Sequence, residues 1–277
     1  MTGQSLPEYL LQRERWLVLA GLVLLIFLAW LYLLTGAGMA MSIQEMTRLS
    51  LLPHRNTAMI MPMPGMEEAG WGASQLIMVF FMWSIMMIAM MLPGAAAVIL
   101  LYARVIRHSQ KAITSPVFVP TLFFISGYLL IWLLFSVIAT FIQWWLDQHH
   151  WLSMYLASNN GWLSGSLLIA VGLYQLSPFK QDCLRHCQSP AQFLSTHMRP
   201  GRKGASLMGL EHGLYCLGCC WLLMGLLFVS GIMNLVWIAV LALFVLAEKV
   251  IVPGKWLSRA SAILLVSWGL VIWYSFV

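Results

Sequence analysis

The sequence contains few charged residues. Only 9% of its 277 residues are Asp, Glu, Lys or Arg, whereas 61% are hydrophobic, and a soluble domain usually carries about 25% charged residues. So little charge cannot cover a surface that faces water, which argues against a soluble enzyme, a nucleic-acid-binding module and a disordered scaffold. The composition instead predicts an all-α, polytopic transmembrane helix bundle, with the lipid bilayer and no nucleic acid as its partner.

Several motifs of energy-coupled and catalytic proteins are absent as well. The sequence has no nucleotide-binding loop, no aspartyl-phosphate motif of a P-type pump and no evident serine or carboxylate-pair catalytic site. ATP-driven pumping by this chain alone is therefore not expected, and whether the chain is an enzyme stays open. No cleavable signal peptide is evident, because the first apolar run, Trp16–Leu34, has about 19 residues and can cross a bilayer as a retained helix.

Seven apolar runs predict membrane-spanning helices. They are Trp16–Leu34, Ser74–Ala103, Val117–Trp145, Gly161–Leu176, Ser206–Ser230, Asn234–Ala247 and Leu257–Val277. With a cytoplasmic N-terminus, thirteen of the fifteen Lys and Arg residues fall in cytoplasmic segments, as the positive-inside rule requires. We therefore expect one integral membrane domain over residues 1–277, with an external Met-rich loop at 35–73 and a cytoplasmic Cys/His loop at 177–205.

The fifth apolar run carries a stripe of candidate metal ligands. His212, Cys216 and Cys219 are spaced four and three residues apart, so they share one face of a helix, and Cys220 lies beside them. Sulfur and imidazole suit Cu(I) or zinc rather than Mg²⁺ or Ca²⁺. Two alternatives remain open: the thiols pack as small apolar groups, or Cys219 and Cys220 do redox work as adjacent thiols.

A second group of candidate ligands precedes the stripe. One helical turn in the cytoplasmic loop would bring Cys183, His186 and Cys187 together, and Arg185 would favour the thiolate form of the cysteines. The spacing does not match the C-x-x-C pattern of a structural zinc finger. The alternative is a surface loop whose thiols stay reduced in the cytosol.

Methionines and one acid complete the candidate ligands. The outer loop contains Met59, Met61, Met63 and Met66, and the second apolar run contains a stripe that includes Met86 and Met90. Thioethers bind Cu(I) without losing a proton, although methionines at helical spacing also serve as packing. Glu248 is expected near the cytoplasmic boundary, where it would pair with Lys249, orient His212 at a metal site, or be solvated.

The chain resembles a bacterial family of predicted metal-binding integral membrane proteins whose domain has no known function. The resemblance covers Trp71 to the C-terminus. The matching motifs are Met90-Met91-Leu92-Pro93, Tyr174–Lys180, Cys183–Pro190, His212–Trp221 and Glu248-Lys249. The resemblance implies metal binding and residence in a membrane, which for a bacterial protein of this kind is the inner membrane. It does not include the outer Met-rich loop.

These observations predict a membrane protein that handles Cu(I), either for transport or for delivery to a cuproenzyme. The metal would pass from the outer methionines along the second span to the stripe on the fifth span, and then to the cytoplasmic Cys/His group. Zinc is the alternative metal, and a metallochaperone or a cuproenzyme is the expected protein partner. A membrane thiol oxidoreductase and a non-catalytic subunit of a larger complex are the alternative functions.

Overall fold

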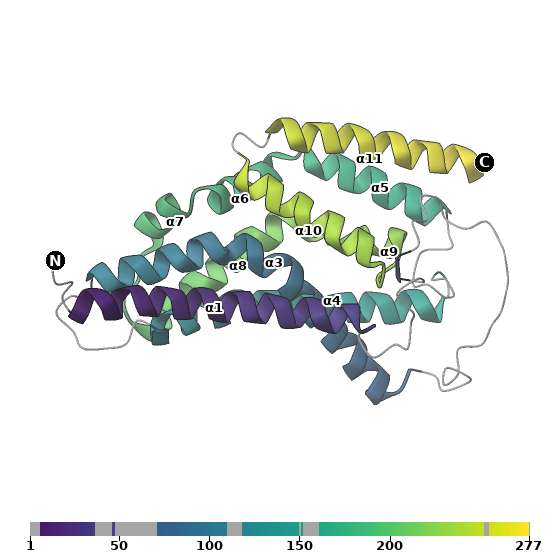
Figure 1. Ribbon diagram of the computed structural model, residues 1–277. Helices are drawn as coiled ribbons and strands as arrows, with labels where there is room; N and C mark the ends of the chain where they lie inside the picture. Colours follow the sequence, from purple (N-terminus) through teal and green to yellow (C-terminus); the bar gives the residue numbers. More distant parts are fainter. Residues whose placement is uncertain are drawn as a thin grey trace.

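The structure consists of packed helices (Figure 1). This computed structural model describes residues 6–36, 46–47, 71–109, 118–149, 151, 161–251 and 255–276, which exclude the methionines of the outer loop. The helices are α1 (Leu6–Leu34), α3 (Ala73–Ser109), α4 (Phe118–Gln148), α5 (Gly161–Gln175), α6 (Pro178–Gln188), α7 (Pro190–His197), α8 (Gly201–Gly225), α9 (Leu227–Ser230), α10 (Leu235–Val250) and α11 (Lys255–Phe276). Within the described residues the expected all-α class is confirmed.

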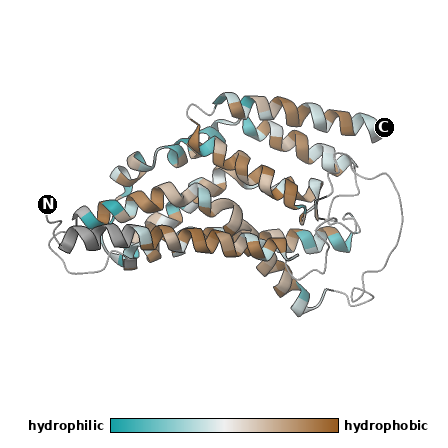
Figure 2. Cartoon of the chain, in the orientation of Figure 1, coloured by the Kyte–Doolittle hydropathy of each residue, from teal (hydrophilic) through white to brown (hydrophobic). Residues whose placement is uncertain are grey.

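Long apolar helices are compatible with residence in a membrane. Within the described ranges, five stretches are long and apolar enough to cross a bilayer, in α1, α3, α4, α11 and in α8 together with α9. Hydrophobic residues run along most of the length of these helices (Figure 2). Large apolar side chains on the outer helices, such as Phe27 on α1 and Ile263 on α11, are exposed, as a surface in contact with lipid requires.

The number of candidate spans in the described residues differs from the expected seven. It is five, or six if α5 and α6, which meet at an angle of 62°, form one broken span. At 1.5 Å per residue, the 16 residues of α10 extend only about 24 Å, short of a hydrocarbon core of about 30 Å. The Asn234 side chain accepts hydrogen bonds from the N–H groups of Val236 and Trp237 and thereby fixes the start of this helix.

The closest helix contact is between α4 and α8. Gly127 of α4 lies against the backbone of Ser206, and Gly209 of α8 lies against the backbone of Phe124. A Cβ atom at either glycine would collide with main-chain atoms, which cannot move aside as a side chain can. Small residues in membrane helices permit such close backbone approach, and here they hold α8 against α4 along the segment that leads to the cysteines.

The expected cytoplasmic loop at 177–205 is mostly helical instead. Ser177 accepts a hydrogen bond from the Lys180 N–H and caps α6, which begins at Pro178. Pro190 begins α7 directly afterwards. Proline suits the first position of a helix because its missing N–H would have no partner there. The segment thus contains two short helices rather than one turn, and α6 packs against α8 and buries part of one face.

Candidate metal centre

Three of the five cysteines lie on the buried face of α8. Cys216, Cys219 and Cys220 are at most 2% exposed, and none of them forms a disulfide. The thiols of Cys219 and Cys220 donate hydrogen bonds to the main-chain carbonyl of Cys216, at 3.1 and 2.9 Å. The spacing-based prediction that these sulfurs share one helix face agrees with this arrangement.

Helix α6 places the other two cysteines against α8. The Cys187 thiol lies close enough to those of Cys216 and Cys219 to interact with both. The Cys183 sulfur lies over Gly218, where a Cβ atom would come within 2.7 Å of it. The sequence suggested two groups at different depths, but the structure joins their thiols because α6 packs on α8. We call Cys187, Cys216, Cys219 and Cys220 the thiol cluster.

Helix α3 adds a thioether to the thiol cluster. The Cys220 thiol donates to the Met91 sulfur at 3.8 Å, and the Tyr128 hydroxyl donates to the Met91 carbonyl at 3.0 Å. The predicted ligands Met86 and Met90 are buried on the same helix, but the methionine that contacts a cysteine is Met91. The regular four-residue spacing of the methionines predicts a stripe that does not include Met91, which directly follows Met90 in the sequence.

A lysine from α10 reaches into the thiol cluster. The Lys249 ammonium donates to the Cys216 sulfur at 3.0 Å, and the Tyr128 oxygen lies 3.2 Å from the same sulfur. Lys249 is only 6% exposed, and Gly94 makes room for it, because a Cβ there would lie 2.9 Å from the lysine nitrogen. From the sequence, Lys249 was expected in a cytoplasmic loop, where its charge indicates the orientation of the chain in the membrane. Its contact with the Cys216 sulfur was not predicted.

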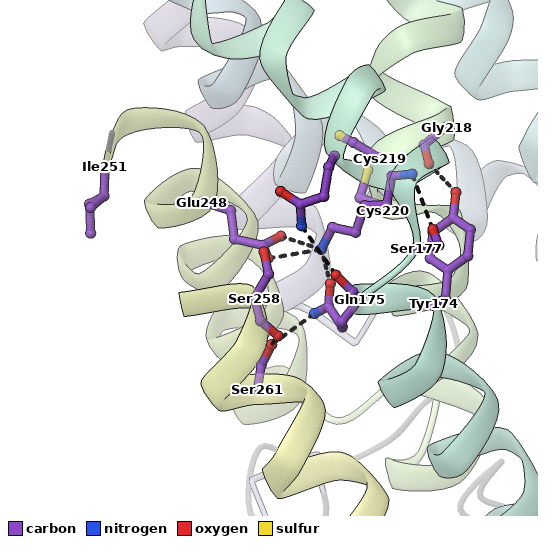
Figure 3. A network of polar contacts seen from close by, with 12 residues as sticks. Tyr174, Gln175, Ser177, Gly218, Cys219, Cys220, Glu248, Ile251, Ser258 and Ser261 are labelled. Carbon is purple, nitrogen blue, oxygen red and sulfur yellow. Dashed lines mark hydrogen bonds and ion pairs between the residues drawn. The ribbon is translucent and has the colours of Figure 1, made fainter. Parts of the chain in front are cut away.

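Glu248 belongs to a neighbouring polar network. Both of its carboxylate oxygens lie 2.8 Å from the Lys180 ammonium, and one also accepts a hydrogen bond from Ser258 at 2.8 Å. Lys180 donates to Gln175 as well, and Gln175 donates to Ser261 (Figure 3). Glu248 therefore neutralises a buried lysine, and the contacts of its carboxylate are with Lys180 and Ser258 rather than with the predicted Lys249 or His212.

The two predicted histidine ligands lie at the edge of the thiol cluster. His212 is 2% exposed, its Nδ1 atom has no hydrogen-bond partner, and its ring lies 5.1 Å from that of Phe193. The His186 ring stacks on Tyr215 with centroids 4.1 Å apart, and its Nδ1 atom lies 2.9 Å from the carbonyl oxygen of Asp182. His186 is thus held beside Tyr215 rather than among the thiols.

The donors that lie together are soft. Among the residues that the structure describes, no group of three or more His, Cys, Asp or Glu side chains is arranged to hold a metal ion. The groups that do lie together are thiols and one thioether, which are soft donors of the kind that bind Cu(I) or zinc rather than Mg²⁺ or Ca²⁺.

Comparison with known families identifies the chain's relatives. A family model named PpoB2 and described as a copper chaperone matches residues 80–272, which is more than half of the chain and includes all five cysteines. Neither the curated proteins nor the solved structures contain a match. The expectation of a copper-related function, drawn from the soft ligands, is thereby supported. The chain belongs to this copper chaperone family.

Proposed function

We propose that the protein binds Cu(I) in the membrane at the thiol cluster and delivers it to a protein partner, as a metallochaperone for a cuproenzyme. The observation that carries the proposal is the convergence of four free, buried thiols and the Met91 thioether from three helices. Membership of a copper chaperone family supports copper as the cargo. Thiolates bind Cu(I) more tightly than thioethers, so the thiol cluster is the place where the ion would rest.

The charges around the thiol cluster suit a monovalent ion. Cu(I) held by two thiolates carries one net negative charge, and the Lys249 ammonium beside Cys216 balances it. Glu248 does not alter this balance because it is paired with Lys180. A buried ion is tolerated only when it is paired in this way. On binding copper, a thiol of Cys219 or Cys220 would release its proton and give up its bond to the Cys216 carbonyl.

We infer that the protein resides in a bacterial inner membrane with its N-terminus in the cytoplasm. The support is the distribution of Lys and Arg, which favours the N-terminal tail and the segment 177–205. The start of α1 and helix α7 lie toward the same end of the molecule in Figure 1. The thiol cluster would then be reached from the cytoplasmic side through α6 and α7.

Metal analysis of the purified protein tests the proposal. Detergent-purified wild type, loaded with copper under reducing conditions, should retain Cu(I), and the Cys216→Ser/Cys219→Ser/Cys220→Ser variant should lose it. Cys183→Ser is the matched control, because it removes a nearby cysteine outside the thiol cluster. Removal of the metal by bicinchoninate rather than EDTA distinguishes Cu(I) from zinc. Equal copper in the triple variant and the wild type would refute the assignment.

A membrane thiol oxidoreductase is the second candidate. It is favoured by the contact of the Lys249 ammonium with the Cys216 sulfur, because a neighbouring cation stabilises the nucleophilic thiolate. The same preparations separate the two functions. Protein that takes up no copper, and in which two of the clustered thiols are oxidised to a disulfide on isolation, would favour redox chemistry.

A further inference from the structure

Three histidines from different helices surround two aromatic rings beside the thiol cluster. His186 of α6 stacks on Tyr215 at 4.1 Å, and His197 of α7 stacks on Phe193 at 4.9 Å. The His212 ring on α8 lies 5.1 Å from the Phe193 ring. Tyr215 and His212 lie on α8 within about one helical turn of Cys216, so these rings are close to the thiol cluster along the helix.

Main-chain carbonyls hold two of these histidines by their Nδ1 atoms. The Nδ1 atom of His186 lies 2.9 Å from the Asp182 carbonyl, and that of His197 lies 3.1 Å from the Phe193 carbonyl. A carbonyl can only accept a hydrogen bond, so in the His186 contact Nδ1 carries the hydrogen and Nε2 is left for another partner. The Nδ1 atom of His197 also lies 2.8 Å from the Thr196 hydroxyl. Histidines that bind metals typically have this arrangement, in which a carbonyl orients the ring and fixes the tautomer.

The three rings also differ in depth. His186 and His197 are partly exposed, whereas His212 is buried and its Nδ1 atom has no hydrogen-bond partner. A buried polar atom without a partner is costly and is uncommon in folded proteins. His212 lies one helical turn before Cys216, so the imidazoles form a series from the partly exposed surface of α6 and α7 to the first thiol.

We propose that His186 and His197 form a transfer site for Cu(I), through which copper passes between a partner protein and the thiol cluster by way of His212. The inference rests on the proposed copper-binding function. Cu(I) keeps its oxidation state throughout. At the last step the bond from copper to an imidazole nitrogen breaks as a bond to a cysteine sulfur forms, and the thiol proton passes to the vacated nitrogen and on to solvent.

The test separates the rate of copper loading from the affinity. His186→Phe/His197→Phe keeps both aromatic stacks but removes both nitrogens. Loading of the apo-protein from a Cu(I)–bicinchoninate complex, followed in a stopped-flow instrument, should slow by about tenfold or more, while the equilibrium affinity stays close to that of wild type. His149→Phe is the matched control, because His149 also contacts aromatic rings, those of Trp145 and Trp151, in another part of the chain.

Further variants distinguish a ligand from a packing residue. His186→Met supplies a thioether in place of the imidazole and should recover much of the loading rate, whereas His186→Phe alone should not. The single variants also serve if the double variant fails to fold. An unchanged rate in the phenylalanine variants, or an equal loss of rate and affinity, would overturn the transfer site. Wild type that binds no Cu(I) would instead overturn the proposed function, and this inference with it.

Discussion

The contact between Lys249 and Cys216 predicts a strong energetic coupling between these residues. Both side chains are buried, and the ammonium lies 3.0 Å from the sulfur. At an effective dielectric constant of about 20, two opposite unit charges at this distance attract by about 5 kcal/mol, much of which offsets their desolvation. Removing the sulfur leaves the ammonium buried without this partner, so Cys216→Ala should reduce the free energy of unfolding by about 3 kcal/mol.

A double-mutant cycle measures this coupling. Lys249→Met removes the charge that needs a partner, so Cys216→Ala should cost about 2 kcal/mol less in the Lys249→Met background than in wild type. The assay is reversible unfolding of the metal-free, reduced protein in mixed detergent micelles, followed by circular dichroism. Cys219→Ala is the control. Its thiol donates to a main-chain carbonyl, so it should cost about 1 kcal/mol and be additive with Lys249→Met.

One result would refute this reasoning. If Cys216→Ala costs no more than Cys219→Ala, and if its effect adds to that of Lys249→Met within about 0.5 kcal/mol, the lysine and the sulfur are not a charge pair. The charge balance that favours a monovalent metal would then lose its basis.

Two further predictions concern the support of the thiol cluster. Gly218→Ala places a Cβ atom 2.7 Å from the Cys183 sulfur, so it should displace α6 and weaken Cu(I) binding in a competition titration. The control Gly225→Ala meets no atom closer than 3.7 Å and should leave binding unchanged. Equal effects of the two variants on Cu(I) binding would contradict the close packing of α6 on α8. Glu248→Gln leaves the buried Lys180 ammonium without its counter-charge and should lower the free energy of unfolding by about 3 kcal/mol in the same unfolding assay. A decrease in the free energy of unfolding of less than about 1 kcal/mol would contradict the ion pair.

The ligand stripe on α8 could be predicted because it is local. The spacing of Cys216 and Cys219 alone determines that they share a helix face, and the softness of their sulfurs indicates copper. The contact of Cys187 with Cys216 could not be predicted in this way. It depends on α6 folding back on α8, and neither helix carries a sequence signal for its partner.

The lysines show a second limit of sequence reasoning. Lys180 and Lys249 were counted as cytoplasmic charges because they lie between apolar runs of the sequence. The structure buries both, because each finds an acceptor far away in the chain: Lys180 bonds to Glu248 across 68 residues, and Lys249 bonds to Cys216 across 33. Hydropathy predicted seven spans, whereas five or six candidates lie among the described residues, because it registers the apolar character of a segment such as α10 but not the cap that limits its length.

Glu248 and Lys249 are neighbours on α10, yet their side chains reach different partners on α6 and α8. Successive residues on a helix point about 100° apart, so both bonds depend on the same angular setting of α10. A turn of this helix that draws the ammonium away from sulfur must also pull the carboxylate from its own lysine. Exposure of the thiols by movement of α10 would therefore be an all-or-none event, in which two buried charge pairs open together.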